Sequence, residues 1–233
     1  MEKINHLKSE IIRIGQELWM QGFTPANAGN ISVRLADGTL LCTPTRISKS
    51  MLTKEAILQL DSHGSPLDPN TIYAPSSEIK LHLEVYRQRP DILAVIHAHP
   101  PFATTFASLG EDLSRNILPE ATLQIGTIPV ARYGTPSTSE LSDSIIAPLH
   151  TSDVILLENH GCIAVAHDLK TAQFRLEILE HYCKILFNLK MLGKTSDLTE
   201  EQVKKLIELR SKMQIPGRAL IQSAHQKVQF PIK

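Results

Sequence analysis

The sequence of 233 residues is poor in aromatic side chains, in net charge and in cysteine. Aromatic residues make up 5% of the chain, and 24 lysines and arginines balance 24 aspartates and glutamates. No basic face or aromatic platform is therefore expected, which argues against a nucleic-acid partner. The three cysteines, Cys42, Cys162 and Cys183, form no C-x-x-C pair and no disulfide framework, which fits a reducing cytoplasm.

Long apolar segments are also missing. No run approaches the roughly 20 apolar residues that a membrane helix needs. The polar opening MEKINHLKSE has no apolar core of the kind found in signal peptides. We therefore expect no membrane partner and a cytoplasmic location. The hydrophobic content of 42% is nevertheless sufficient for a substantial core.

Helix-like and strand-like patterns alternate along the chain, with no internal repeat and no low-complexity linker, which predicts one α/β domain. The predicted helices cover residues 3–21, 76–89, 138–150, 171–192 and 199–214. The predicted strands cover a hairpin at 30–44, a short strand within 54–75, and 92–99, 127–134 and 153–166, the last as one long strand or a pair. We divide the chain into a catalytic domain, 1–195, and a C-terminal helix and tail, 196–233. That tail packs on the body, reaches a neighbouring subunit or is partly disordered.

Ten histidines stand out in this composition, and two of them close an apolar strand. In the segment AVIHAHPP, residues 94–101, His97 and His99 follow a run that is apolar on both faces. Alternate side chains of a strand point the same way, so the two rings lie about 7 Å apart along the strand and can reach one metal ion. Two histidines fraying into solvent are the alternative. The apolar run favours a cleft at the strand end.

A third histidine follows another apolar run. His160 in LLENHGCIA precedes Gly161, which lets the backbone turn or lets a ligand come close. Its alternative role is a hydrogen-bonded histidine in a strand-end turn. Three histidines with one open position are typical of catalytic zinc. Cys162 could close a structural zinc shell, but a strand reversal at Gly161 would point it away.

A carboxylate is available in the segment APSSEIKLH. Ser76, Ser77 and Glu78 are expected at a helix N-terminus, where free N–H groups and the helix dipole favour an anion. Capping alone is the alternative role, because serine and glutamate are common in the first turn. One helix and one strand separate Glu78 from His97, so a layered fold can place the carboxylate over the strand end.

Five motifs fall in one order along the chain: AGNIS at 28–32, TPT at 43–45, PSSE at 75–78, HAHP at 97–100 and NHG at 159–161. In this order and spacing the chain resembles the class II aldolase/adducin-type family over about residues 8–195, and within it the ketose-phosphate aldolases. The resemblance implies a three-layer α/β/α domain with a largely antiparallel central sheet. It also implies a homotetramer with the active site near a subunit interface.

The resemblance further implies a role for each motif. It assigns Zn²⁺, or another divalent cation, to His97, His99 and His160, and the catalytic acid/base role to Glu78. The phosphate of a small sugar phosphate would be bound by Gly29, Asn30, Thr45, Ser76 and Ser77, with Arg46 beside them. The implied reaction is cleavage of a ketose 1-phosphate to dihydroxyacetone phosphate and an aldehyde through a metal-stabilised enediolate.

The chain departs from the family pattern at two places. Arg46 stands where the family commonly has glycine, and it either adds a contact to phosphate or carboxylate or blocks the pocket. The family's aldolases use a tyrosine ahead of the IPVARY-like strand and another near the C-terminus. Here no tyrosine precedes Tyr133 in that region and none follows Tyr182. Glu120 is either a substitute proton donor or part of a salt bridge at the rim.

Alternatives of other classes therefore remain. A dehydratase, decarboxylase or epimerase of the same fold would use the same metal chemistry. An adducin-like interaction module would keep the fold without activity, but a scaffold has no physical need for three histidines and Glu78. The sequence SSE, where the epimerases have SSD, favours the aldolases. We expect an enzyme, a metal-dependent lyase.

Overall fold

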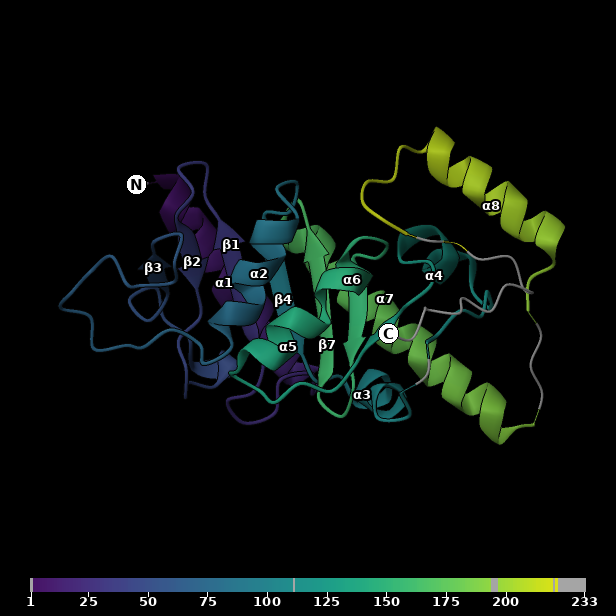
Figure 1. Cartoon of the computed structure of the whole chain (residues 1–233), viewed down its shortest axis with the longest axis horizontal. Helices are drawn as coiled ribbons and strands as arrows, with labels where there is room; N and C mark the ends of the chain where they lie inside the picture. Colours follow the sequence, from purple (N-terminus) through teal and green to yellow (C-terminus); the bar gives the residue numbers. More distant parts are fainter. Residues whose placement is uncertain (1, 111, 194–196, 220, 222–233) are drawn as a thin grey trace.

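A seven-stranded sheet forms the centre of the computed structural model, which describes residues 2–110, 112–193, 197–219 and 221 (Figure 1). The strand order is β3-β2-β1-β4-β7-β6-β5. The strands are β1 (Asn30–Arg34), β2 (Leu40–Cys42), β3 (Leu58–Leu60), β4 (Ala94–Ala98), β5 (Val130–Ala131), β6 (Val154–Leu157) and β7 (Gly161–Ala166). All neighbouring strands are antiparallel except β5 and β6. This confirms the largely antiparallel sheet.

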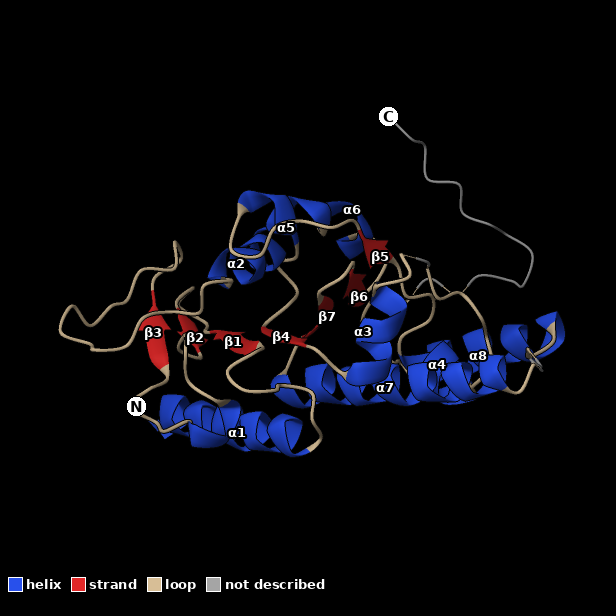
Figure 2. Ribbon diagram, turned by 90° about the horizontal axis from the view of Figure 1, so that it is seen from below, coloured by secondary structure: helices blue, strands red, loops and turns tan. Residues whose placement is uncertain are grey.

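Helices cover both faces of this sheet and give three layers (Figure 2). One face carries α2 (Ile79–Gln88), α5 (Ser139–Ser144) and α6 (Ile146–Leu149). The other carries α1 (Glu2–Met20) and α7 (Leu169–Met191). Three further helices pack along α7 and one another: α3 (Pro101–Ala107), α4 (Pro119–Gln124) and α8 (Glu200–Lys212). A short 3-10 helix, η1 (Lys49–Met51), packs on α1.

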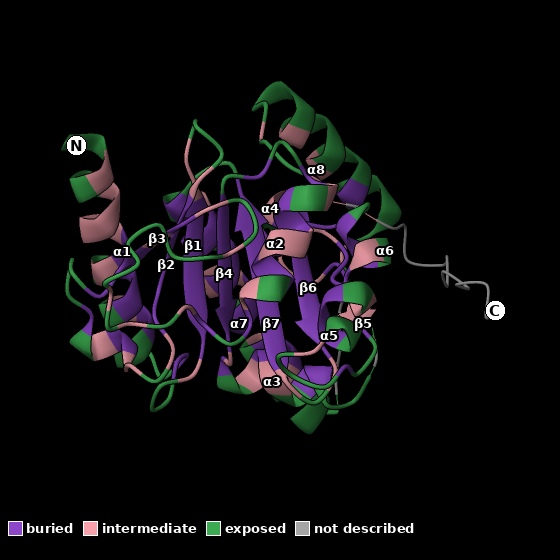
Figure 3. Cartoon of the chain, turned by 60° about the vertical axis from the view of Figure 1, so that its left-hand side comes forward, coloured by how far each residue is buried: buried purple, intermediate pink, exposed green. Residues whose placement is uncertain are grey.

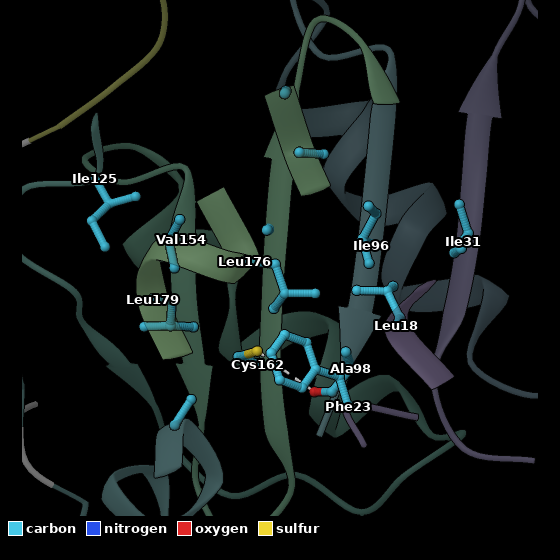
Figure 4. Close-up of a cluster of buried hydrophobic side chains, with 14 of the residues drawn as sticks. Leu18, Phe23, Ile31, Ile96, Ala98, Ile125, Val154, Cys162, Leu176 and Leu179 are labelled. Atoms are coloured by element: carbon cyan, nitrogen blue, oxygen red, sulfur yellow. Dashed lines mark hydrogen bonds between the residues drawn. The ribbon is translucent and has the colours of Figure 1, made fainter. Parts of the chain in front are cut away.

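The core consists of two apolar clusters, one on each face of the sheet. Side chains of β4 alternate between them: Ile96 and Ala98 face α1 and α7, whereas Val95 faces α2. Figure 4 shows the α1 and α7 side, where Leu18 and Leu176 lie over the strands. Burial on both faces explains why β4, β6 and β7 read as continuous apolar runs, and Figure 3 shows these strands buried.

Most predicted elements are confirmed, including the hairpin, the first helix and the long helix before residue 192. The 153–166 segment is the pair β6 and β7. The 138–150 helix is instead two short helices, because Pro148 has no N–H to offer the carbonyl of Ser144. The 127–134 strand shrinks to two residues at the edge of the sheet, next to Pro129.

Two other differences concern helix starts. The prediction that α2 begins at Ser76 or Ser77 is wrong, because Glu78 has non-helical backbone angles and α2 begins at Ile79. Helices α3 and α4 were not predicted from the sequence. Both are short, and both begin with a proline at the first helical position, Pro101 and Pro119, which was the available signal.

The C-terminal segment is tied to the body at a buried aspartate. The carboxylate of Asp153 accepts bonds from Arg89 at 2.9 Å and from the N–H of Arg218 at 2.8 Å, and it pairs with Arg175 at 2.9 Å. Gly217 lies so close that a Cβ would meet Asp153 and Arg175. Residues 222–233, on which part of the tail prediction falls, lie outside the described residues. None of the described helices is both long and apolar enough to cross a membrane.

Candidate active site

Three histidine side chains meet at one end of the central strands. The Nε2 atoms of His97 and His99 lie 2.9 Å apart. The centroid of the His160 ring lies 4.7 Å from that of His97 and 5.0 Å from that of His99. One nitrogen from each ring can be chosen so that all three atoms lie within 4.8 Å of one another. The structure therefore brings together the three residues that the sequence singled out.

The backbone around His160 explains this convergence. Asn159, with a φ of +56°, helps to close the tight turn between β6 and β7, and asparagine tolerates this left-handed conformation better than most residues. Gly161 begins β7 just after the reversal. A Cβ there would lie 2.5 Å from the carbonyl oxygen of Ala98 and 2.7 Å from Cδ2 of His99. Gly161 is therefore needed for close packing of the two strand ends.

The far side of the His97 ring is also fixed. Its Nδ1 lies 2.9 Å from the carbonyl oxygen of Cys162, a contact in which the ring N–H donates. This leaves the lone pair of Nε2 directed at the other two histidines. The thiol of Cys162 points the other way, toward the carbonyl of Ala98 (Figure 4).

Glu78 lies against the histidine group. Its Oε2 is 3.2 Å from Nε2 of His97, and its Oε1 is 3.2 Å from Nε2 of His160. Glu78 is the N-cap residue of α2, but its side chain makes no capping hydrogen bond, and the residue is only 8% exposed. A glutamate that only capped the helix would turn toward the backbone amides. Capping alone therefore does not explain this side chain.

The electrostatics of the site favour an ionised carboxylate. Burial by itself would raise the pKa of Glu78, but the adjacent rings of His97 and His160 outweigh burial and hold this pKa well below its usual range. Burial, with the charges of the neighbouring rings, lowers the pKa of His99 to about 3. A neutral His99 keeps a lone pair that can bind a cation.

The donor set suits a divalent metal ion. Two imidazole nitrogens on one tetrahedral zinc ion are about 3.3 Å apart when the Zn–N bonds are about 2.0 Å, and the Nε2 atoms of His97 and His99 are 2.9 Å apart. Within the described chain, Nδ1 of His160 and Oε1 of Glu78 are buried without a well-aligned hydrogen bond. Buried polar atoms rarely stay unpaired. The three histidines could therefore hold a metal, with Glu78 beside it.

The TPT and PSSE segments, which carry three of the predicted phosphate contacts, lie next to one another. The N–H of Thr45 donates to the carbonyl of Ala74 at 3.0 Å. Ser76 is buried, and its Oγ accepts the N–H of Glu78 at 3.3 Å. Ser77 is exposed. The two segments thus form one surface that leads to the carboxylate.

Asn30 and Gly29 lie on the sheet side of the same carboxylate. Asn30 pairs with His97 in the register of β1 and β4, and its Nδ2 donates to Oε2 of Glu78 at 2.9 Å. The amide has a second N–H for a ligand. Gly29 has a φ of +72°, and a Cβ there would lie 2.8 Å from the carbonyl oxygen of His97. Glycine is the residue that meets both constraints.

Lys49 joins the loop before β1 to the residues that follow the TPT segment. It is 1% exposed, and its Nζ donates to the carbonyls of Asn27 and Ile47 at 3.2 and 3.1 Å. Burial lowers its pKa to about 8. This residue was not predicted from the sequence, because a single lysine in a polar segment gives no sign of burial.

Arg46 is exposed and has a φ of +63°, a backbone conformation that favours glycine. The family's usual glycine at this position is therefore explained, and the arginine is held in a strained conformation. Glu120 lies elsewhere: with Phe174 and His181 it lines a hollow of about 680 Å³ formed by α4, α7 and residues 213–216. This location gives no support to Glu120 as the substitute proton donor.

His82 is another residue of the site that was not predicted from the sequence. It is 1% exposed on α2, and its Nε2 contacts Oδ1 of Asn30. His82 follows Glu78, the N-cap residue, by four residues, or about one helical turn, and both side chains contact Asn30. That spacing was the available signal.

A three-layer fold with a histidine group and a buried carboxylate at one end of its sheet is typical of enzymes that use a bound metal. The family described as "Class II Aldolase and Adducin N-terminal domain" matches residues 9–187. The chain belongs to this family. It is an enzyme of the lyase type, which confirms the prediction made from the histidines and Glu78.

Both aldolases and decarboxylases are among its relatives. The chain is 28% identical over 184 residues to 3-oxo-tetronate 4-phosphate decarboxylase of Pectobacterium atrosepticum, covering 77% of this chain and 83% of the relative. It is 31% identical over 205 residues to L-fuculose phosphate aldolase of Escherichia coli, covering 88% and 94%. A solved structure of L-fuculose 1-phosphate aldolase matches with a TM-score of 0.80 at 30% identity, covering 88% of this chain and 95% of that chain. The resemblance to the ketose-phosphate aldolases is confirmed.

Proposed function

We propose that this enzyme releases dihydroxyacetone phosphate from a small ketose 1-phosphate, such as L-fuculose 1-phosphate, by aldol cleavage. The observation that supports this most directly is the buried carboxylate of Glu78, whose oxygens lie 3.2 Å from Nε2 of His97 and from Nε2 of His160. We propose Zn²⁺ as the metal, with other divalent cations as substitutes, held by His97, His99 and His160. An aldolase of this kind needs a cation, a proton carrier and a phosphate site.

The reaction breaks one C–C bond. The hydroxyl on the leaving carbon gives its proton to solvent water, and that carbon becomes the carbonyl of the aldehyde. The bonding electrons stay with the ketone half, which becomes an enediolate, and a proton added to its terminal carbon gives dihydroxyacetone phosphate. A divalent cation at the three histidines supplies positive charge for the ketone oxygen and for the negative charge that develops on it.

Glu78 is the proposed proton carrier at the terminal carbon. As a carboxylate it removes a proton from this carbon, and as the acid it returns one. The proposed phosphate site consists of Gly29, Asn30, Thr45, Arg46, Ser76 and Ser77. Binding a remote phosphate fixes the reacting carbons relative to Glu78, so that binding energy contributes to catalysis.

Decarboxylation is the second candidate, and two observations favour it. The relatives include 3-oxo-tetronate 4-phosphate decarboxylases at 28–30% identity. The chain also has no tyrosine in the 115–132 region, where the family's aldolases have one. Loss of CO₂ from a 3-oxo-tetronate 4-phosphate leaves the same enediolate, but no hydroxyl proton has to be removed first. Both candidates therefore end in the same proton transfer and in dihydroxyacetone phosphate.

A substrate panel separates the two candidates. Zinc-loaded protein is incubated with L-fuculose 1-phosphate, other ketose 1-phosphates, 3-oxo-tetronate 4-phosphate and the unphosphorylated forms as controls. Aldol cleavage gives dihydroxyacetone phosphate and an aldehyde in equal amounts. Decarboxylation gives dihydroxyacetone phosphate and CO₂. Release of dihydroxyacetone phosphate from none of these phosphates contradicts the proposal.

We also propose a homotetramer in the cytoplasm. The described part of the chain leaves large apolar side chains exposed, including Phe174, Met191 and Leu192 of the α7 region, which suits burial against a second copy. The cysteines are free and buried, which suits a reducing compartment. Light scattering should give about four times the chain mass of 25.9 kDa. A monomer at micromolar concentration contradicts the tetramer.

A further inference from the structure

A row of polar side chains crosses the interface between α2 and β1, where the surrounding core is apolar. Glu78, the N-cap residue of α2, is followed at intervals of four residues by His82 and Tyr86 on the helix, and Asn30 and Ser32 lie two residues apart on β1. The two periods therefore place all five side chains on facing surfaces. The neighbours in this layer, among them Leu81, Val85 and Val95, are apolar. Buried polar groups are costly in such a layer unless each has a partner.

Each member of the row contacts the next. Nδ2 of Asn30 lies 2.9 Å from Oε2 of Glu78, and Oδ1 of Asn30 contacts Nε2 of His82. Nδ1 of His82 lies 2.6 Å from Oγ of Ser32, which lies 2.8 Å from the hydroxyl of Tyr86. The carboxylate of Glu78 is thus connected to a buried histidine through one amide group.

The chemistry of the end group fixes the direction of every bond. A carboxylate accepts only, so the NH₂ group of Asn30 faces Glu78 and its Oδ1 faces His82. His82 must then donate from Nε2, and its Nδ1 accepts the hydroxyl proton of Ser32. Burial, with the His97 ring nearby, lowers the pKa of His82 to about 3, which agrees with a neutral ring that has one N–H. Only one arrangement satisfies all members.

We propose that His82 is a positioning residue: it fixes the side-chain amide of Asn30, and this amide holds Oε2 of Glu78 in place for proton transfer. The inference rests on the proposed role of Glu78 as the proton carrier. Without the N–H of His82, the amide of Asn30 is free to rotate, and Glu78 loses the one bond that comes from outside the histidine group. A rotated amide would present its oxygen to the carboxylate and repel it.

Three substitutions separate positioning from a purely structural role. His82→Leu removes the donor. His82→Gln restores an N–H near the position of Nε2, so it should recover most of the activity. Tyr86→Phe is the matched control, because it removes a buried hydroxyl from the same helix face and leaves the bond between Ser32 and His82 intact. If the role is structural, the loss of stability in each variant should depend on the number of hydrogen bonds removed. If His82 positions Asn30, turnover should fall only in variants that lose the contact to Asn30.

The kinetic probe is dihydroxyacetone phosphate alone, whose hydroxymethyl hydrogen exchanges with D₂O through the proposed proton transfer. His82→Leu should lower the exchange turnover by about 10–100-fold, as for other partners that orient an active-site group, with little change in KM. The exchange turnover of His82→Gln should stay within about fivefold of the wild-type value, and that of Tyr86→Phe within about threefold. Equal reductions in His82→Leu and Tyr86→Phe would overturn the inference. If His82→Leu does not fold, Ser32→Ala takes its place, and it should slow exchange more than Tyr86→Phe does.

A crystallographic comparison keeps this inference apart from the proposed function. Metal-free crystals of the wild type are compared with those of His82→Leu, or with those of Ser32→Ala if His82→Leu does not fold. The 2.9 Å hydrogen bond between Asn30 and Glu78 should be present in the wild type and broken in the variant. An unchanged pair overturns the positioning role, whatever the enzyme's activity. Glu78→Gln is assayed in parallel. Unaltered exchange in that variant rejects the proposed proton carrier, and the crystals alone then decide whether His82 positions the pair.

Discussion

Oε2 of Glu78 lies 3.2 Å from Nε2 of His97, although one residue precedes α2 and the other lies near the end of β4. The contact arises because α2 packs on the sheet and the chain then returns through β4 beneath it. The carboxylate therefore reaches the end of the strand that carries the histidines. This relation places a carboxylate from a helix N-cap against the histidines that we propose as metal ligands, where we propose that it carries the proton.

Removal of two of the histidines should abolish metal binding. His97→Ala/His99→Ala leaves His160 as the one remaining nitrogen donor of the group, and a single imidazole does not hold zinc against dilution. Metal analysis of protein purified without chelator should give about one ion per wild-type chain, as expected for one mononuclear site, and almost none in the variant. Full occupancy in the double variant would show that the metal site lies elsewhere.

Gly161→Ala should weaken metal binding through packing alone. The new Cβ would lie 2.5 Å from the carbonyl oxygen of Ala98, so the end of β4 and the ring of His99 must move. We expect a decrease in stability of about 1–3 kcal/mol and a zinc affinity about 10–100-fold lower. Gly38→Ala is the control: its φ of +85° strains an alanine, but the space around it is open. Its zinc affinity should be that of the wild type, and equal affinities in both variants would refute the packing role.

Arg46→Gly tests whether the strained arginine binds the anion. Glycine removes about 1 kcal/mol of left-handed strain but adds a similar entropy to the unfolded chain, so stability should change by less than about 1 kcal/mol. If the guanidinium grips phosphate or carboxylate, KM should rise about tenfold with kcat nearly constant. Steady-state kinetics on the best phosphorylated substrate measures this. An unchanged KM with broader substrate range would indicate that Arg46 narrows the pocket instead.

The sequence predicted those helices and strands whose positions are determined by the periodicity of apolar residues. Strands such as β4 and β7 are buried on both faces, so their apolar runs are unambiguous. The errors lie where proline or a site residue overrides that signal. Pro148 splits one predicted helix, and Glu78 delays the start of another.

The candidate site was predictable only for residues that belong to short motifs. His97 lies in β4 and His99 follows the last residue of that strand, and their two-residue spacing places both rings on one side. The contact of Glu78 with Asn30 depends instead on how α2 sits over β1, which no local pattern encodes. Lys49 was missed for the same reason, and His82 was missed although its spacing of four residues from Glu78 was a local signal. Their roles follow from burial, and burial of a polar side chain is a property of the assembled layers.

Hydrogen exchange on dihydroxyacetone phosphate tests the catalytic role of Glu78 most directly, because it isolates the proton transfer that aldol cleavage and decarboxylation share. Zinc-loaded wild-type protein in D₂O should replace one hydroxymethyl hydrogen of dihydroxyacetone phosphate with deuterium, and proton NMR monitors the loss of the hydrogen signal. Glu78→Gln keeps the shape of the side chain and should slow this exchange by about 10²–10⁴-fold. Its zinc content should be unchanged, and its stability should be nearly unchanged, because loss of a negative charge at a helix N-terminus costs about 0.3–1 kcal/mol. Exchange at a near wild-type rate in zinc-loaded Glu78→Gln would contradict the assignment of Glu78 as the proton carrier.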